Sequence, residues 1–535
     1  MAVDMEKLVS LCRRRGFIFQ SSEIYGGING FWDYGPMGVE LKRNIKDAWW
    51  QDMVRNPPVG PDGDEVSMVG VDCAIIMNPK VWIASGHVGG FSDPMADCRE
   101  SKKRYRADQL SAIVPDAADA PLFVFINNDE DSLKAATKKA RKVQKNLPEP
   151  VPVKAFLEIA KDPQMFARTV APEVDTQGTL TEPRAFNLMF ESYAGAIQDE
   201  SNKVYLRPET AQGIFANFRN VLDSSRLKVP FGIAQIGKAF RNEINPRNYT
   251  FRSREFEQME IEFFCHPDES MKWYRWWREL RIRWYSQLSI RSDALRPREQ
   301  DKEELAHYSI GTTDIEYMFP FADEPQELEG VAHRGSFDLT AHMKASQKDL
   351  TYFDEEAWER DKTGRTTNSF KDWLKTSPTP EQIEKYQYVP HVIEPSAGAD
   401  RFTLAVLCEA YTEDKLPDEK GVMQERLLMK FHPRLAPIKA AILPLVNKDG
   451  MPEKAEKLYR ELKASFNVVY DDKGAVGRRY RRQDEAGTPF CFTIDGQTMQ
   501  DDTVTLRDRD TAIQRRVPIA DVERIVRDAL KSKCV

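Results

Sequence analysis

The residues best suited to chemistry lie between positions 237 and 264, in the segment GKAFRNEINPRNYTFRSREFEQMEIEFF. Two stretches of strand-like alternation flank the polar loop INPRNYT, which predicts an antiparallel hairpin. Alternate residues of a strand share a face, so one side of the second strand should carry Arg252, Arg254, Phe256, Gln258 and Glu260. Arginines suit phosphates, and a carboxylate suits an ammonium group. With an aromatic ring for a purine, the hairpin predicts a site for a nucleotide next to a small zwitterion.

The same hairpin resembles the second signature motif of the class II aminoacyl-tRNA synthetases. That motif is an Arg-x-Glu, a variable loop, an Arg-x-x-x-Phe and a nearby acidic residue, matched here by Arg241, Asn242, Glu243, Arg252, Phe256 and Glu260. The third motif of these enzymes is similar to IEPSAGADRFTLAVLCEA, in which Gly398 and Arg401 precede an apolar helix. The first motif has a looser counterpart in GFWDYGPMGVELKRNIKDAWW, where residues 38–53 have helical spacing.

The sequences of several segments resemble, within this class, those of the homodimeric glycine–tRNA ligases. These segments are RPETAQGIFANF at 207–218, RNEINPR, REFEQMEIEFF and VIEPSAG, and the resemblance covers residues 1–108, 181–270 and 307–535. It implies an α+β fold, with a class II catalytic domain (an antiparallel sheet flanked by helices) and a C-terminal α/β anticodon-binding domain. It also implies a homodimeric ligase that activates glycine with ATP to glycyl-adenylate and transfers glycine to the 3′ end of tRNA(Gly).

The resemblance assigns nucleotide roles residue by residue. Two arginines are the catalytic pair: Arg241 contacts the α-phosphate, while Arg401 covers one face of adenine and reaches the γ-phosphate. Phe256 stacks on the other face, and Glu243 holds the adenine amino edge. The remaining ATP-binding residues are Asn242, Phe251, Arg252, Glu327, Leu328, Gly398, Ala399 and Asp400. Mg²⁺ is the expected metal, bridging the phosphates with Glu327 from QELEG and Glu394 as its ligands.

Glycine offers no side chain to grip, so its pocket must work by excluding any ligand with a Cβ atom. Several carboxylates around one ammonium group would bind it and also fill the volume that a methyl group needs. By the resemblance, the ammonium group and Cα meet Glu209, Gln258, Glu260, Glu394 and Ser396, and Arg106 pairs with the carboxylate of glycine. Taken singly, each of these glutamates would more often be an exposed strand or turn residue.

At 535 residues the chain exceeds the size of one hydrophobic core, so two domains are expected. We predict a catalytic domain over residues 1–430, with insertions at about 111–175, 267–306 and 345–385 where the composition becomes more polar or strongly helical. The segment at 267–306 is interpreted as a helical insertion or surface arm. Residues 431–535 form the anticodon-binding domain, because an apolar run, a helix and the short strand NVVY indicate a βαβ unit.

Composition excludes several other classes. The net charge of −7 offers no global attraction for nucleic acid, so RNA binding must depend on local patches. Seven cysteines stand singly, without a CxxC pair, so neither a zinc site nor a disulfide framework is expected. The N-terminus lacks a signal pattern and no run approaches about 20 apolar residues, which indicates a cytoplasmic protein that does not enter membranes.

Four alternatives remain open from the residues. The hairpin could be a solvated surface with weak ion pairs. The chain could also be a non-catalytic adaptor of the same fold, a ligase for another small amino acid, or an ATP-dependent carboxylate ligase that does not use tRNA. The presence of all the motif residues disfavours the adaptor, and the terminal domain favours tRNA.

Overall fold

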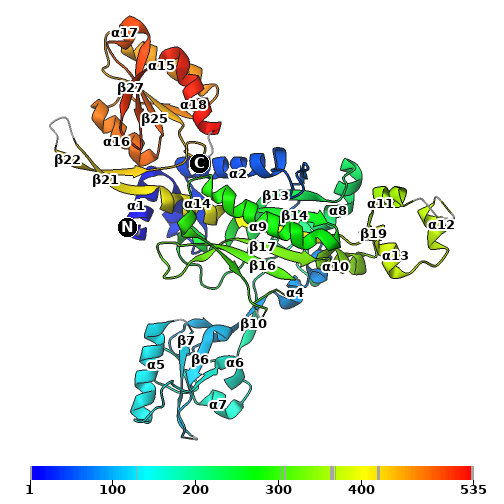
Figure 1. Cartoon of the computed structure of the whole chain (residues 1–535). Coiled ribbons are helices and arrows are strands. Elements are labelled where there is room, and N and C mark those ends of the chain that lie inside the picture. The colour runs from blue at the N-terminus through cyan, green and yellow to red at the C-terminus, as the bar shows by residue number, and fades with distance from the viewer. Residues whose placement is uncertain are drawn as a thin grey trace. The chain divides into compact units, whose positions relative to one another are not determined.

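The computed structural model describes residues 3–531, apart from 118, 128, 303, 307–308, 362–366, 368 and 418–421. The chain divides into two compact units, Met1–Ser85 with Ser192–Val535 as unit 1 and Gly86–Glu191 as unit 2 (Figure 1). Within the described residues, no helix combines the length and the apolar character needed to cross a membrane.

Unit 1 is organised around a seven-stranded sheet. Its neighbouring strands are antiparallel, apart from one parallel pair at the β13–β3 edge. In spatial order the strands are β15 (Leu295–Glu299), β16 (Gly311–Tyr317), β17 (Gln326–Gly335), β20 (His391–Gly398), β14 (Glu255–Cys265), β13 (Phe231–Phe240) and β3 (Ser67–Gly70). Helices cover this sheet, so the predicted α+β fold with an antiparallel catalytic sheet is confirmed.

Strand β14 shows how the sequence decides which face is which. Its odd-numbered residues Met259, Ile261 and Phe263 are apolar and join the main core, against α2 (Pro36–Trp50), α9 (Ser270–Ser286) and α14 (Ala399–Ala410). Its even-numbered residues Gln258, Glu260 and Glu262 are polar and face the opposite side, because side chains alternate along a strand. A second core on that side packs α8 (Ala211–Ser225) and α10 (Phe337–Ser346) against the sheet. Helices α8 and α10 leave part of this polar face of the sheet uncovered.

The segment at 267–306 is not the surface arm that its sequence suggested, because it packs against the central sheet. Helix α9 runs across the sheet (Figure 1), and its tryptophans Trp277 and Trp284 belong to the main core. The arginines between the aromatic residues are not all solvated: Arg281 is fully buried and forms a two-point ion pair with Glu329 of β17. Strand β15 then completes the edge of the sheet. A helix this rich in aromatic residues needed a surface to cover, and the sheet supplies it.

The segment at 345–385 packs around a small aromatic cluster of its own. Helices α11 (Glu355–Arg360), α12 (Phe370–Leu374) and α13 (Pro380–Glu384) accompany a two-stranded ribbon of β18 (Tyr352–Phe353) and β19 (Gln387–Tyr388). Trp358 and Tyr386 are the buried centre of this cluster, with Trp373 packed against them. Positions 362–366 and 368 of the predicted excursion lie outside the described residues.

Unit 2 contains the predicted insertion at 111–175 but begins earlier and ends later. A four-stranded sheet forms from β8 (Val153–Ala155), β6 (Leu110–Ile113), β7 (Leu122–Ile126) and β9 (Thr169–Val170), and α5 (Glu130–Val143) packs on it. The flanking strands β4 (Ser92–Asp97), β5 (Arg104–Arg106) and β10 (Arg184–Asn187) pair with one another in a second sheet. Composition therefore marked the middle of the unit and missed the strands at its ends.

The C-terminal part of unit 1 is a five-stranded α/β module. Strand β23 (Ala440–Pro444), helix α15 (Met451–Lys463) and the parallel strand β24 (Val468–Tyr470) confirm the predicted βαβ unit. Helix α16 (Val476–Ala486), β25 (Phe490–Ile494), β26 (Thr503–Asp508), β27 (Gln514–Pro518) and α18 (Val522–Lys531) follow. Strand β27 was not predicted, because this edge strand, QRRVP, carries one buried apolar residue, Val517.

Candidate active site

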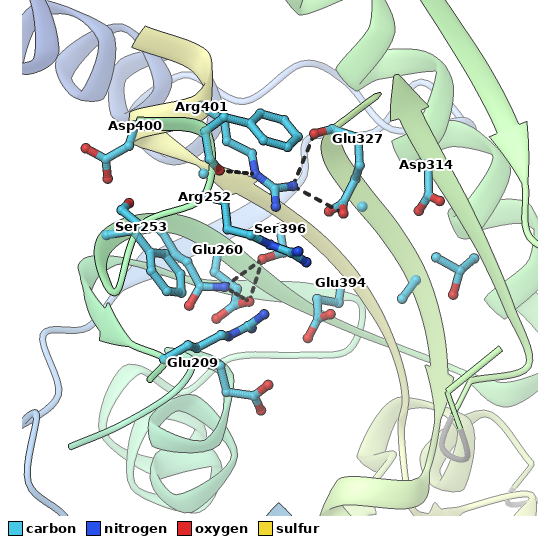
Figure 2. Close-up of a pocket in the computed structure, with 18 of the residues that line it drawn as sticks. Glu209, Arg252, Ser253, Glu260, Asp314, Glu327, Glu394, Ser396, Asp400 and Arg401 are labelled. Carbon is cyan, nitrogen blue, oxygen red and sulfur yellow. Dashed lines mark hydrogen bonds and ion pairs between the residues drawn. The ribbon is translucent and has the colours of Figure 1, made fainter. Parts of the chain in front are cut away.

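The polar side of the central sheet holds a cavity of about 390 Å³. Strands β14, β16, β17 and β20 form its floor, the loop of the β13–β14 hairpin and the start of α14 form one wall, and the turn before α8 reaches its edge. Most of the residues predicted from the sequence meet there (Figure 2): Glu209, Arg241, Glu243, Phe251, Arg252, Phe256, Gln258, Glu260, Glu327, Glu394, Ser396, Gly398, Asp400 and Arg401.

One end of the cavity is cationic and aromatic. The Arg241 Nε donates to the carbonyl of Pro208 at 3.0 Å, which holds the guanidinium 5.4 Å from the centre of the Phe256 ring. At the start of α14, Arg401 lies 4.6 Å over the ring of Phe251 and forms an ion pair of 3.2 Å with Glu327. The Arg401 guanidinium lowers the pKa of Glu327, so this carboxylate is ionised at neutral pH.

The other end gathers carboxylates. Glu260 accepts hydrogen bonds from Thr210 and from Ser396, the second at 2.7 Å, and Gln258 bonds to Ser396 at 3.2 Å. Glu209 accepts from Gln212 of α8 at 3.0 Å. Figure 2 shows Glu209, Glu260, Glu394 and Ser396 grouped at this end, with Arg401 and Glu327 toward the other. The cavity thus joins a cationic end to an acidic one.

Arg334, which was not predicted from the sequence, supports the acidic end. This buried arginine at the end of β17 donates to both oxygens of Asp338, at 2.8 and 2.9 Å, and to Glu394 at 2.7 Å. It is the cation that offsets the charge of the cluster. Even so, burial raises the pKa of Glu394 to about 8 and the pKa of Glu260 above its usual value. Repulsion among Glu209, Glu260 and Glu394 adds to both shifts. The available signal was a lone arginine in the block GVAHRGSFD, which otherwise continues a strand.

Some predicted residues do not line the cavity with their side chains. Asn242, Leu328 and Ala399 are absent from its wall, and the last two belong to the main core. Asp400 borders the cavity, but its carboxylate binds Lys42 at 2.7 Å and the backbone N–H of Glu257 at 2.7 Å. Its side chain therefore fastens α14 to α2 and β14, and a nucleotide would meet its backbone.

Arg254 corrects the prediction that alternate hairpin residues from 252 to 260 share one face. Its Nε donates to the carbonyl of Glu243 at 2.8 Å and its Nη1 to that of Asn29 at 2.9 Å, and it does not line the cavity. Strand β14 begins only at Glu255, and the preceding residues follow a 3-10 turn, so the two-residue period does not extend to them.

Arg106 belongs to unit 2, where it is the last residue of strand β5. Its guanidinium pairs with Asp108 at 2.7 Å and with Asp93 at 3.1 Å. Its contact with the carboxylate of glycine stays a prediction.

Residues that were not predicted as ligands also line the wall. Gln300, Thr312, Asp314, Gly330 and Ala332 line the cavity from the β15–β16–β17 side. Asp314 bonds to Gln300 at 2.9 Å and to Arg298 at 2.8 Å, and burial raises its pKa. The alternation in TTDIEY was the available signal, because it leaves the acid on the polar face of β16.

The two predicted magnesium ligands differ in their fit. Mg²⁺ prefers ionised carboxylates and keeps several of its waters. Glu327 is ionised and half-exposed in the cavity, so it fits. Glu394 is buried and already bonded to Arg334, so it fits poorly. Among the described residues, the one group of three carboxylates close enough to share an ion is Glu260, Glu262 and Glu394, and all three have raised pKa values.

Comparisons with known proteins identify the family. Residues 190–409 match the tRNA synthetase class II core domain (G, H, P, S and T), and residues 439–529 match an anticodon binding domain. A glycine–tRNA ligase from Rhodopirellula baltica is 56% identical over 99% of this chain and all of its own length. Those from Lachnospira eligens and Thermobifida fusca are 46% and 44% identical, over 99% and 98% of this chain and 100% and 98% of their own lengths. This chain belongs to the glycine–tRNA ligase family.

The two family matches coincide with parts of the fold of this glycine–tRNA ligase. The class II core match contains β13, β14, β17 and β20, which supply most of the cavity, and the anticodon-binding match coincides with the C-terminal module.

Proposed function

We propose that the cavity holds ATP at its cationic end and glycine at its acidic end, so that the glycine carboxylate faces the α-phosphate. The chain activates glycine with ATP to glycyl-adenylate and transfers glycine to the 3′ end of tRNA(Gly). The observation that carries this assignment is the junction, in one cavity, of Arg241, Phe256 and Arg401 with Glu209, Glu260 and Glu394.

At the nucleotide end, adenine stacks on Phe256, and Arg401 covers its other face and reaches the γ-phosphate. Arg241 contacts the α-phosphate, where negative charge grows on the equatorial oxygens as the carboxylate attacks. A guanidinium already held by the Pro208 carbonyl needs no reorganisation at that moment, which is how preorganised charges lower a barrier. Glu243, 3.5 Å from Arg252, accepts from the adenine amino group.

At the glycine end, the carboxylates surround the ammonium group and leave no volume at Cα. Ser396 and Gln258 hold Glu260 in place through hydrogen bonds, so its carboxylate cannot swing away to admit a methyl group. Alanine would then meet a hydrogen-bonded wall rather than a flexible one, and exclusion gives the specificity. Arg106 is assigned to the carboxylate of glycine.

We assign magnesium to Glu327 rather than to Glu394, on the fit described above. When bound, Mg²⁺ neutralises phosphate charge and helps pyrophosphate to leave. The chain's own contribution is the Arg401–Glu327 pair, which keeps the Glu327 carboxylate ionised and aimed into the cavity. Asp314 and Gln300 line the same side and complete the polar surroundings of the phosphates.

Three further assignments follow from the family. Residues 431–535 read the tRNA as an anticodon-binding domain, and residues 1–430 are the catalytic domain with unit 2 inserted in it. The protein acts as a homodimer, with α2 and β3 as the counterparts of the first class II motif. It works in the cytoplasm.

The test is ATP–pyrophosphate exchange, run separately with glycine, alanine and serine in the presence of magnesium. We expect exchange with glycine alone, and we expect Arg241→Ala to reduce it by about 100-fold or more, because one charge-stabilising donor at the reacting group is lost. Arg219→Ala, an exposed residue paired with Asp223 on α8, is the matched control and should retain the rate. Folded protein without exchange for any of the three amino acids would refute the enzyme assignment and favour an adaptor. Exchange with alanine or serine would refute the glycine pocket.

A further inference from the structure

Glu262 is a carboxylate that the proposed mechanism does not use. It lies on β14, and its side chain is fully buried, at 0% exposure. No described donor forms a hydrogen bond to either of its carboxylate oxygens. An isolated buried carboxylate without donors is very costly, so its environment calls for an explanation.

The register of the sheet places Glu262 opposite Glu394. Strands β14 and β20 pair Glu260 with Ser396 and Phe263 with Ile393, and this register places Glu262, the neighbour of Phe263, opposite Glu394. Carboxylate oxygens of Glu260, Glu262 and Glu394 lie within 4.8 Å of one another. Like charges directly opposite on neighbouring strands are destabilising, and burial increases the effect. Glu262 and Glu394 therefore cannot both be ionised.

The surrounding charges decide which of the two keeps the proton. From β17, Arg334 donates to Glu394 at 2.7 Å and also to Asp338 of α10, whereas neither carboxylate oxygen of Glu262 accepts a hydrogen bond from a described donor. The other titratable groups on the packed elements include Glu260 on β14, Glu209 and Arg207 before α8, His333 on β17, His342 on α10 and His391 on β20. The Arg207 guanidinium donates to the carbonyls of Lys238 and Cys73. Burial lowers the pKa of each of these histidines, so they are neutral and add no positive charge. The cation favours an ionised Glu394, and the proton belongs on Glu262.

We propose that Glu262 is a positioning residue for glycine: as a neutral carboxylic acid beneath the pocket, its O–H donates to the Glu394 carboxylate and keeps that carboxylate ionised toward the glycine ammonium group. This role rests on the proposed function, because Glu262 can position glycine only if glycine binds at the acidic end of the cavity. The proton stays on Glu262 throughout, and no bond to the substrate forms or breaks there.

The pKa directions agree with this geometry. Burial, and next the charge of Glu394, raise the pKa of Glu262 well above its usual value, and that of Glu394 rises to about 8. Glycine binds through ionised carboxylates, so its apparent KM should rise as pH falls below about 8, when Glu394 takes up a proton. Removing the Glu262 donor destabilises the ionised form of Glu394, which moves this rise to higher pH.

The experiment compares Glu262→Leu, which removes the donor, with Glu262→Gln, whose amide can replace it. ATP–pyrophosphate exchange is measured from pH 6 to 9 with glycine or ATP varied in turn, and thermal unfolding checks that each variant is folded. E262L should raise KM for glycine by roughly 10- to 100-fold at pH 7.5 and leave KM for ATP unchanged, the loss expected for a hydrogen bond to a charged group. E262Q should stay within about threefold of wild type, since it conserves the donor. Glu255→Gln is the matched control. Glu255 lies on the same strand as Glu262 but outside the cavity, and it pairs with Lys238 of β13.

Infrared spectroscopy gives a second test that does not depend on activity. Wild-type protein should show the C=O stretch of a buried carboxylic acid that E262Q lacks, and absence of this difference would overturn the proposal even if E262L fails to fold. An E262L profile equal to that of wild type, or an E262Q loss as large as that of E262L, would also overturn it. Wild-type protein without glycine-dependent exchange would instead refute the proposed function itself.

Discussion

Replacing Arg281 by methionine should destabilise the protein strongly. The arginine and its partner Glu329 are 0% and 1% exposed, joined by bonds of 2.7 and 3.0 Å, and Tyr285 donates to the same carboxylate. Methionine conserves most of the apolar volume beside Trp284 but removes the cation, which lies 4.4 Å over that ring. The carboxylate of Glu329 is then buried without its partner, and breaking such a pair costs about 3–5 kcal/mol.

A double-mutant cycle separates the ion pair from simple packing. In Arg281→Met/Glu329→Gln the buried charge is gone and Tyr285 can still donate to the amide oxygen, so the double variant should regain about 2 kcal/mol or more relative to Arg281→Met. Unfolding in urea is followed by tryptophan fluorescence, because α9 carries four tryptophans. Arg278→Met, on the same helix in a more exposed pair with Glu299, is the control and should cost less than about 1 kcal/mol.

A buried ion pair between Arg281 and Glu329 should give a specific pattern in the double-mutant cycle. An Arg281→Met variant within about 1 kcal/mol of wild type would show that Glu329 is not held as a buried charge. A double variant as unstable as the sum of the two single variants would show that the residues do not interact. Either result would also contradict the burial of the Arg281–Glu329 pair between α9 and the sheet.

Two further predictions concern the site and the terminal domain. Glu209→Gln removes one carboxylate from the glycine end and keeps the bond to Gln212 possible, so it should raise KM for glycine by about 10-fold in ATP–pyrophosphate exchange; an equal rise in KM for ATP would contradict the separation of the two ends. Arg479→Ala removes the donor to the carbonyls of Pro444, Asp471 and Leu445, so the C-terminal module should unfold at lower temperature and tRNA charging should fall while exchange persists. Equal loss of charging and exchange would show that the module is not independent of the active site.

The elements nearest the chemistry were predictable because their patterns are local. The alternation in FEQMEIEFF specifies a strand with one apolar and one polar face, and β14 has that form. The spacing that follows DYGPMG specifies the amphipathic helix α2. The βαβ order of the last hundred residues likewise depends on short-range periodicity. In each case a period of about two or 3.6 residues decides which side chains share a face.

Other features were not predictable because two distant segments create them. The tryptophans of α9 read equally well as a surface arm or as a core face, and only the sheet beneath them decides. Arg254 turns away from the cavity because the chain enters β14 through a 3-10 turn. Arg334 stands between Asp338 and Glu394 although Glu394 is 60 residues further along the chain.

The sequence by itself therefore determined the residue types that ATP and glycine require, the strands and helices that carry them, and through its motifs the family. Tertiary structure alone decided the electrostatic state of the site. The charge of Glu394 depends on Arg334 of β17, on Glu262 of the neighbouring strand β14 and on burial by nearby helices. None of these lies beside Glu394 in the chain. Burial and through-space charge set protonation, and both are properties of the folded arrangement rather than of any local pattern.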